Sequence, residues 1–457
     1  MAGEHLSPRV DVETFSLISR AEAMRAEHAQ FVPSVNYPSR NVRDAVGSVL
    51  IEPYAEGRPN ARYYPGQEVN DDVERLAMAR ARNLFDSDVV NVQPHSGAVA
   101  NFAAYTGIVG KDTLRQRRGR IMGLSLAAGG HLSHGADVSA TSVFFDSIPY
   151  GLDQDGKIDF EAMLERAKQT KPDIIVAGTT AYSRFLEWDK FRFVADQVGA
   201  HLHADISHIA GLIAGRVHPS PSEWVDTWMT TTHKSLRGAR GAMIGITERG
   251  KLKDPKLVSR INSAVFPMLQ GGPHMHSIAG IAVTLFEASQ PEFRDYAGRV
   301  VETAKVLSDE LQKRGIPIVT GGTDNHLLLA DLTTRGISGK TVSQALERVY
   351  ILANSNSVPS DPNPFTRPAG VRLGTPAAAS RNLGHEEMVQ FADFIGRVVD
   401  GLEESKRTLG LSDEDEIDKD KRQGIIEQVV FLGEIREGVR DITGRFPIPD
   451  HYMYDAT

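Results

Sequence analysis

Short apolar segments alternate with amphipathic helical segments over residues 71–205, and this alternation constrains the fold more than any other feature of the sequence. Short apolar runs bounded by turn residues are typical of buried strands, whereas apolar residues three and four positions apart are typical of helices. Strands that alternate with helices build a mostly parallel sheet, because parallel neighbours need a crossover connection. We therefore expect an α/β fold. The expected strands are residues 89–92, 120–126, 174–178 and 200–205.

Helices are expected on both sides of these strands. The clearest is 71–85, because Asp71 and Glu74 have the spacing of a capping box ahead of an apolar face. Another is expected at 12–29, and a polar arm with two prolines follows at 33–39.

The second part of the chain has a different pattern. A long helix expected at 293–315 leads into strands and helices that are mixed rather than regularly alternating, which favours an α+β module. We expect three parts: an N-terminal helix and arm at 1–45, a large domain at 46–292 and a smaller C-terminal domain at 293–457. The strands expected in the last part are 316–319, 325–332, 351–354 and 370–374.

Composition excludes several classes of function. The net charge of −8 argues against a general nucleic-acid binder. The 457 residues include no cysteine, which removes disulfides, thiolate zinc sites and cysteine nucleophiles. Residues 1–13 carry charges of both signs, and no apolar run is long enough for a membrane span, so we expect neither a signal peptide nor membrane insertion. A cytoplasmic protein is the expectation.

One lysine stands in an unusual setting. Lys234 follows three threonines and His233, and a turn with two glycines and two arginines comes after it. Its neighbours in sequence include no carboxylate that would hold it protonated, and burial would also lower its pKa, which favours the free amine that attacks a carbonyl. The alternative is an exposed lysine on a basic loop between strands.

Two other strand ends carry residues that could bind a ligand. Ser96 and Gly97 form a turn between a short strand and an alanine-rich helix, where free amides and the helix dipole bind phosphate; many α/β turns contain Ser-Gly without this role. Asp205 ends an apolar strand, where open α/β sheets bind ligands, although it could instead cap the next helix.

A glycine-rich turn presents two histidines. His131 could stack on a planar ring, and its spacing from His134 could alternatively indicate a metal site. We expect no metal, because no acidic third ligand lies beside them in the sequence.

Together these residues supply the parts of a pyridoxal phosphate (PLP) enzyme. Lys234 would bind the aldehyde, and Asp205, 29 residues before it, would keep the ring nitrogen protonated. Ser96, Gly97 and His233 would hold the phosphate. Arg372 would bind an amino-acid carboxylate through two parallel hydrogen bonds.

The chain resembles the serine hydroxymethyltransferase family, which has the fold-type I PLP architecture also found in aspartate aminotransferase. The resemblance implies a homodimer, or a dimer of dimers, with active sites at the subunit interface, and conversion of serine and tetrahydrofolate to glycine and 5,10-methylenetetrahydrofolate. The matching segments are 54–57, 62–64, 91–97, 129–135, 205–211, 230–241, 266–274, 323–326 and 372–376.

The resemblance also implies roles for individual residues. Lys234 resembles the Schiff-base lysine, Asp205 the partner of the ring nitrogen, His208 the ligand of the phenolic oxygen and His131 the stacking imidazole. Glu56 resembles the acid/base group. Thr231 and Arg240 match residues beside the lysine; Ala98 and Thr180 match cofactor-binding positions; Ser34 and Arg372 match carboxylate-binding positions; Tyr54, Glu56, Tyr64, Gly271 and Gly272 match positions that reach in from the neighbouring subunit; and Leu126, Gly130, Leu132 and Asn356 match folate-contacting positions.

Some residues depart from the family pattern around substrate and folate. Val35 replaces a glutamate, Pro65 a glycine, Met229 a threonine and Thr180 a serine. Two alternatives follow. The chain could be a relative with another substrate, such as an α-methylserine hydroxymethyltransferase, a β-hydroxy-amino-acid aldolase or a threonine transaldolase. It could also be a non-catalytic scaffold, although Lys234, Asp205 and Arg372 together argue against that.

Overall fold

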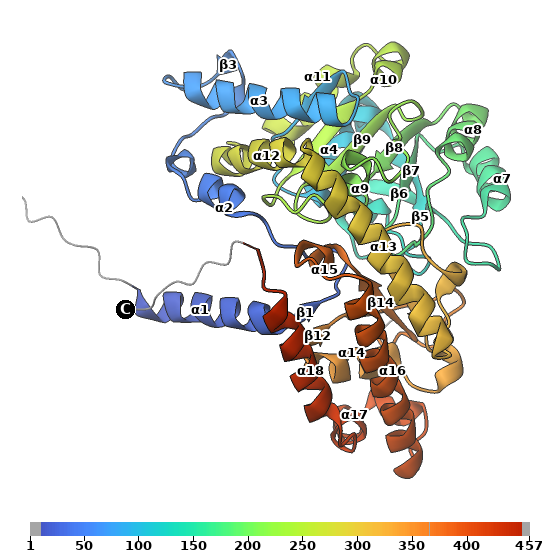
Figure 1. Cartoon of the computed structure of the whole chain (residues 1–457). Coiled ribbons are helices and arrows are strands. Elements are labelled where there is room, and N and C mark those ends of the chain that lie inside the picture. The colour runs from blue at the N-terminus through green and yellow to red at the C-terminus, as the bar shows by residue number, and fades with distance from the viewer. Residues whose placement is uncertain (1–10, 365, 450–457) are drawn as a thin grey trace, which may run out of the picture.

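The computed structural model describes residues 11–364 and 366–449. The expected lack of a signal peptide concerns residues that lie mostly outside this range. The elements are arranged around one seven-stranded sheet and one three-stranded sheet (Figure 1). Among the described residues, no helix has both the length and the apolar character that crossing a membrane requires.

The seven-stranded sheet has the strand order β4-β10-β9-β8-β7-β5-β6. Strand β10 runs antiparallel to both of its neighbours, and all the other adjacent pairs are parallel. The expected α/β fold with a mostly parallel sheet is therefore confirmed. The strands are β4 Val89–Asn91, β5 Gly119–Leu124, β6 Phe145–Tyr150, β7 Ile174–Gly178, β8 His201–Asp205, β9 Thr227–Thr231 and β10 Ala242–Ile246.

Helices cover both faces of this sheet (Figure 1), and each of its central strands is buried along its whole length. Fully buried strands need apolar or internally bonded side chains on both faces, which explains their near-continuous apolar sequences. The helices up to the end of this region are α1 Val12–Glu27, α2 Arg40–Val46, α3 Glu68–Leu84, α4 Gly97–Val109, α5 Lys111–Gln116, α6 Ala140–Phe144, α7 Phe160–Thr170, α8 Trp188–Val198, α9 Ala210–Ala214, α10 Glu248–Lys253, α11 Leu257–Ser263 and α12 Met275–Ala288.

A smaller antiparallel sheet has the order β11-β14-β13. Its strands are β11 Leu327–Asp331, β13 Asn354–Asn356 and β14 Gly370–Gly374. Two short pairs complete the strands: β1 Ala29–Gln30 with β12 Ile351–Leu352, and β2 Gly57–Arg58 with β3 Ala61–Arg62. The remaining helices are α13 Pro291–Lys313, α14 Gly339–Arg348, α15 Pro376–Ser380, α16 His385–Thr408, α17 Lys419–Glu427 and α18 Leu432–Arg445.

Two large hydrophobic clusters form the core, one around the seven-stranded sheet and one around the smaller sheet. Helix α13 contributes to both, with Phe293 and Val300 in the first cluster and Leu307 and Leu311 in the second. The domain boundaries expected at 45/46 and 292/293 stay a prediction.

Two local expectations are wrong. Helix α3 begins at Glu68, so Asp71 and Glu74 do not form its capping box. Their buried carboxylates instead accept hydrogen bonds from Arg62, at 2.9 and 2.6 Å. Residues 316–319 do not form a regular strand: the segment makes one isolated bridge and then a tight turn in which Thr320 has a φ of 66°.

Helix α1 carries apolar side chains that the other described residues leave exposed. It lies beside α18, away from the seven-stranded sheet (Figure 1), and none of its residues is buried. Val12, Leu17 and Met24 are each at least half exposed.

Candidate active site

The candidate residues converge at the carboxyl edge of the central strands. Asp205 is the last residue of β8, the middle strand of the sheet, and pairs with Met229 of β9. Lys234 follows β9 after a short connection that ends in His233. Parallel strands bring their carboxyl ends to one edge, so the two side chains predicted to flank the cofactor share that edge.

Lys234 is buried, with 9% of its surface exposed. Burial lowers its pKa to about 8, Asp205 opposes this shift, and the positive charge of Arg372 adds to it. A larger fraction of this lysine than of an ordinary one is therefore the free amine near neutral pH, which is the form that attacks an aldehyde.

Asp205 is a buried carboxylate whose charge is compensated by its surroundings. One oxygen accepts hydrogen bonds from Asn101 and from Nε2 of His134, each at 2.9 Å, and the other accepts one from the backbone N–H of Ser207 at 3.1 Å. Burial alone would raise its pKa, but the bond with His134 and the nearby charges hold the pKa well below its usual value. The group therefore stays negative and can keep a bound ring nitrogen protonated.

The structure supplies the acidic neighbour that the sequence did not show beside the two histidines. Ligand atoms of His131, His134 and Asp205 lie within 4.8 Å of one another, which is close enough for a metal. However, the carboxylate already accepts three hydrogen bonds and does not need a metal to compensate its charge. Burial lowers the pKa of His131 to about 4, so this ring is neutral and able to stack on a planar group.

Several buried polar atoms around Lys234 have no hydrogen-bond partner within the described residues: Oγ1 of Thr180, Oγ1 of Thr231 and Nδ1 of His233. Buried polar atoms are nearly always paired in folded proteins. Thr180 and His233 stand at positions that the sequence predicted to contact PLP, and Thr231 was predicted to lie beside the lysine. The residues therefore fit a polar ligand bound against this edge of the sheet.

The turn predicted to bind phosphate lies against strand β9. Ser96 precedes α4, and a Cβ added at Gly97 would meet Cγ2 of Thr231 at 2.6 Å. Glycine at this position therefore allows the first turn of α4 to approach β9 closely. Ser96 and Ala98 are exposed at the turn, where their backbone amides can be reached.

Arg372 lies on β14 of the smaller sheet and is also buried. It donates hydrogen bonds to the backbone oxygen of Thr180 at 2.7 Å and to Oδ1 of Asn354 at 3.1 and 3.2 Å. Burial lowers its pKa to about 10, which still leaves it positive at neutral pH. The arm that carries Ser34 contacts the same strand, because Gly374 packs against Pro33.

The five residues expected to serve a neighbouring subunit form one partly exposed group, which we call the Tyr54 group: Tyr54, Glu56, Tyr64, Gly271 and Gly272. The rings of Tyr54 and Tyr64 meet edge to face at 5.4 Å. A Cβ added at Gly271 would meet Oε1 of Glu56 at 3.1 Å, and one at Gly272 would meet the ring of Tyr54 at 3.5 Å. The single chain therefore brings these residues together, and their role in a second subunit stays a prediction.

A hollow lies next to two of the residues predicted to contact folate, although neither of them lines it. A cavity of about 420 Å³ lies between residues 125–128 and 357–363. Leu126 belongs to the first of these segments and Asn356 adjoins the second. Leu132 is 45% exposed, whereas Gly130 is buried, with Leu124 so close that a side chain would clash.

Sequence reasoning missed three residues that contact the predicted ones. Asn101 binds Asp205, His134 binds the same carboxylate, and His326 contacts His208. A polar residue inside the alanine-rich helix α4 was a signal for Asn101, and the spacing from His131 was one for His134. Nothing in the local sequence pointed to His326. Arg240, expected beside the lysine, is exposed.

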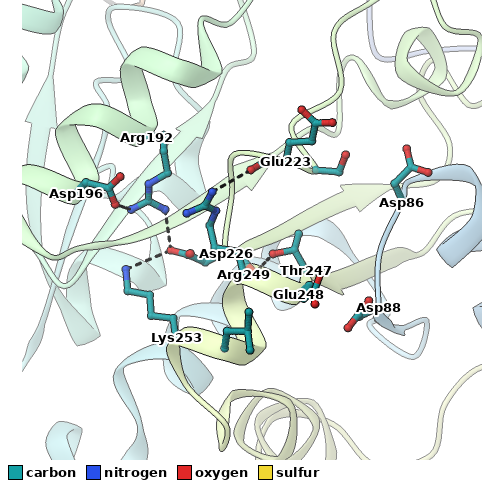
Figure 2. Close-up of a pocket in the computed structure, with 12 residues that line it drawn as sticks. Asp86, Asp88, Arg192, Asp196, Glu223, Asp226, Thr247, Glu248, Arg249 and Lys253 are labelled. Carbon is teal, nitrogen blue, oxygen red and sulfur yellow. Dashed lines mark hydrogen bonds and ion pairs between the residues drawn. The ribbon is translucent and has the colours of Figure 1, made fainter.

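A larger hollow of about 840 Å³ lies at the opposite edge of the sheet. Figure 2 shows Asp226 there between Arg192 and Lys253, to which it is bonded at 3.2 and 3.4 Å. Asp226 precedes the first residue of β9, so this hollow adjoins the amino ends of the parallel strands. Its lining carries more carboxylates than basic side chains. Ligands of open α/β sheets bind at the other edge.

Comparisons with known proteins agree with the family resemblance of the sequence motifs. The model of the serine hydroxymethyltransferase family matches residues 8–395. A serine hydroxymethyltransferase from Acidothermus cellulolyticus is 46% identical over 435 residues, which cover 95% of this chain and 94% of the relative. One from Sorangium cellulosum is 47% identical over 406 residues, covering 89% and 93%, and one from Bartonella henselae is 45% identical over 443 residues, covering 96% and 94%.

Proposed function

This chain belongs to the serine hydroxymethyltransferase family, and from that premise we propose that it is a PLP-dependent enzyme that transfers a one-carbon unit between serine and tetrahydrofolate. The observation that carries the proposal is the pairing of a buried lysine, whose pKa is lowered to about 8, with a buried, charged carboxylate at the same sheet edge. Glycine and 5,10-methylenetetrahydrofolate would be the products.

Bound PLP supplies an aldehyde for an amine and a ring that accepts electrons when the Cα–Cβ bond of serine breaks. Lys234 would provide the amine. Asp205 would hold a proton on the ring nitrogen, and His131 would stack on the ring. Thr180, Thr231 and His233, whose polar atoms lack partners, and the turn Ser96-Gly97-Ala98 would bind the remaining polar groups.

Arg372 and Ser34 would bind the amino-acid carboxylate. The guanidinium presents two parallel N–H donors, which match the two oxygens of a carboxylate. Thr180 and Asn354 hold this side chain in place through its hydrogen bonds, so the arginine is oriented before substrate arrives.

Glu56 would transfer a proton between the serine hydroxyl and folate, a role that a positioned carboxyl group can perform. Leu126, Gly130, Leu132 and Asn356 would contact folate, and the hollow between residues 125–128 and 357–363 lies next to Leu126 and Asn356. A water-excluded position beside Lys234 would favour direct transfer of the one-carbon unit over its release.

A second copy of the chain is the proposed partner. Val49, Ile51 and Tyr63 are each more than 60% exposed in the single chain, and three apolar side chains of α1 are at least half exposed. Contiguous exposed apolar surface marks an interface. We propose a homodimer in which the Tyr54 group completes the site of the other subunit, with a dimer of dimers as the larger assembly, and a cytoplasmic location.

A relative with another substrate is the second candidate, because Val35 and Pro65 change the surroundings of substrate and folate. One experiment separates the two. Purified protein with PLP is mixed with serine or α-methylserine, with and without tetrahydrofolate, and product formation is measured. Folate-dependent glycine production from serine supports the first proposal. Cleavage that is indifferent to folate favours an aldolase or transaldolase, and a protein that never binds PLP contradicts both.

A further inference from the structure

Two buried histidines contact each other between the two sheets. His208 lies in the turn after β8, and His326 directly precedes β11. Nδ1 of His208 and Nε2 of His326 are 3.1 Å apart. The exposed fractions are 4% and 0%, so water does not compete for this hydrogen bond.

Both rings are neutral at ordinary pH. Burial, followed by the positive charges of Arg372 and Lys234, lowers the pKa of His326 to about 3. Burial, followed by the charge of Lys234, holds the pKa of His208 well below its usual value. A neutral imidazole has one N–H and one bare nitrogen, so one ring must donate and the other must accept.

The remaining nitrogen of His326 decides which ring donates. Within the described residues, Nδ1 of His326 is buried and has no hydrogen-bond partner. Buried N–H groups without a partner are rarer than unpaired acceptors. The proton of His326 is therefore on Nε2 and is donated to Nδ1 of His208. His208 must then carry its own proton on Nε2.

We propose that His326 is a positioning residue that fixes His208 as its Nε2–H tautomer, so that this ring presents a hydrogen-bond donor to the oxygen of a bound ligand. The inference rests on the proposed function, in which His208 meets the phenolic oxygen of PLP. That oxygen is an acceptor when ionised, so only this tautomer of a neutral His208 can donate to it.

The surroundings of His326 hold it firmly against the larger sheet. Its backbone oxygen accepts a hydrogen bond from the N–H of Thr375 at 3.0 Å. The side chain of Asn325 donates to the backbone oxygen of Tyr182 at 3.0 Å, and Asp324 pairs with Arg184 at 2.9 Å. His326 therefore links the smaller sheet to the candidate site through one defined contact.

The direct test reads the tautomer from the ¹⁵N spectrum of the full chain labelled at histidine, recorded with and without PLP. The signals of His208 are assigned by their loss in His208→Asn. We expect a protonated Nε2 and a bare Nδ1 in both spectra. A protonated Nδ1 on His208 would overturn the proposal. This readout does not require activity, so it stays decisive even if the proposed reaction is wrong.

A binding measurement provides the second test. His326→Gln retains an N–H donor near the same position, whereas His326→Leu has none. Loss of one neutral hydrogen bond should weaken PLP binding by roughly 2- to 12-fold in His326→Leu, and His326→Gln should recover most of it. His201→Leu is the matched control, because it also removes a buried histidine, whose ring bonds to Thr227 at the amino end of β8.

The outcomes separate the two proposals. Equal PLP affinity in wild type, His326→Leu and His326→Gln would overturn the role of His326. No PLP binding by wild type would contradict the proposed function while the ¹⁵N spectrum still reports the tautomer. If His326→Leu does not fold, the wild-type spectrum and His326→Gln still decide.

Discussion

Asp205 and His134 are joined by a hydrogen bond of 2.9 Å between Oδ2 and Nε2, although 71 positions separate them in the chain. Burial by itself would protonate this carboxylate more readily, and the histidine is the largest influence in the opposite direction. The negative charge beside the candidate cofactor position therefore depends on a residue that would not touch the cofactor's ring nitrogen itself.

Replacement of His134 by alanine should make the free energy of unfolding depend less on pH in the acidic range than it does in wild type. The pKa of Asp205 in the folded chain lies below its usual 3.8, so its contribution to stability is present above that pH and is lost as the pH falls further. His134→Ala raises this pKa, so wild type and variant should differ most at neutral pH and least in acid. Denaturant unfolding at several pH values measures this. A pH-independent difference would indicate a cavity effect alone.

The amine of Lys234 should become reactive at a lower pH than an ordinary lysine. With a pKa of about 8, the rate of PLP capture should rise through pH 8 and then level off. Asp205→Asn removes the charge that raises this pKa, so the rise should move to lower pH. Absorbance stopped-flow over a pH series gives both curves, with Lys234→Ala as the blank. A midpoint near 10.5 would contradict the burial argument.

Arg372→Lys should weaken amino-acid binding by about 1.5–3 kcal/mol, because a single ammonium cannot make two parallel hydrogen bonds with a carboxylate. Spectral titration of the PLP-loaded variant with serine measures the change in Kd. Arg335→Lys is the control. The side chain of Arg335 bonds to Asp400 and Glu403 of α16 and not to residues of the candidate site. An unchanged Kd for serine in Arg372→Lys would remove Arg372 from the substrate site.

The chain should be destabilised by about 3–5 kcal/mol in Arg62→Met, because that change removes the buried cation that pairs with the buried carboxylates of Asp71 and Glu74. Arg62 also donates to the backbone oxygens of Ala55 and Gly57, at 2.7 and 3.2 Å, so the variant should loosen the backbone on both sides of Glu56.

Equilibrium unfolding measures the loss of stability in Arg62→Met, and Arg115→Met is its matched control. The Arg115 side chain is 77% exposed and pairs with the exposed Asp112, so its replacement should cost less than about 1 kcal/mol. Similar losses in both variants would show that the buried position of Arg62 has no special importance.

The proposed homodimer should dissociate in Tyr63→Glu. Tyr63 is 73% exposed in the single chain and lies next to Tyr64 of the Tyr54 group, so a charge there would be buried without a partner in the dimer. Val430→Glu is the control, since Val430 is 92% exposed and far along the chain from this group. Sedimentation velocity gives the assembly state. A dimer that persists in Tyr63→Glu would place the interface elsewhere.

The larger sheet and the edge that carries the candidate site were predictable because they depend on local patterns. Apolar strands that alternate with helices lead to parallel neighbours, and parallel neighbours bring Asp205 and the residues before Lys234 to one edge. The capping box at Asp71 was wrong because α3 begins three residues earlier, at Glu68. Asn101 and His326 were missed because their partners lie 104 and 118 positions away, and spacing between neighbours contains no information about such partners.

Helix α13 runs without interruption for 23 residues, about 35 Å at 1.5 Å per residue, and is anchored in both cores. A continuous helix of this length cannot bend sharply unless consecutive backbone hydrogen bonds break. Lys234 follows a strand of the larger sheet and Arg372 lies on the smaller one. We therefore expect any change in the gap between these two side chains to require a shift in how α13 packs on one of the two cores.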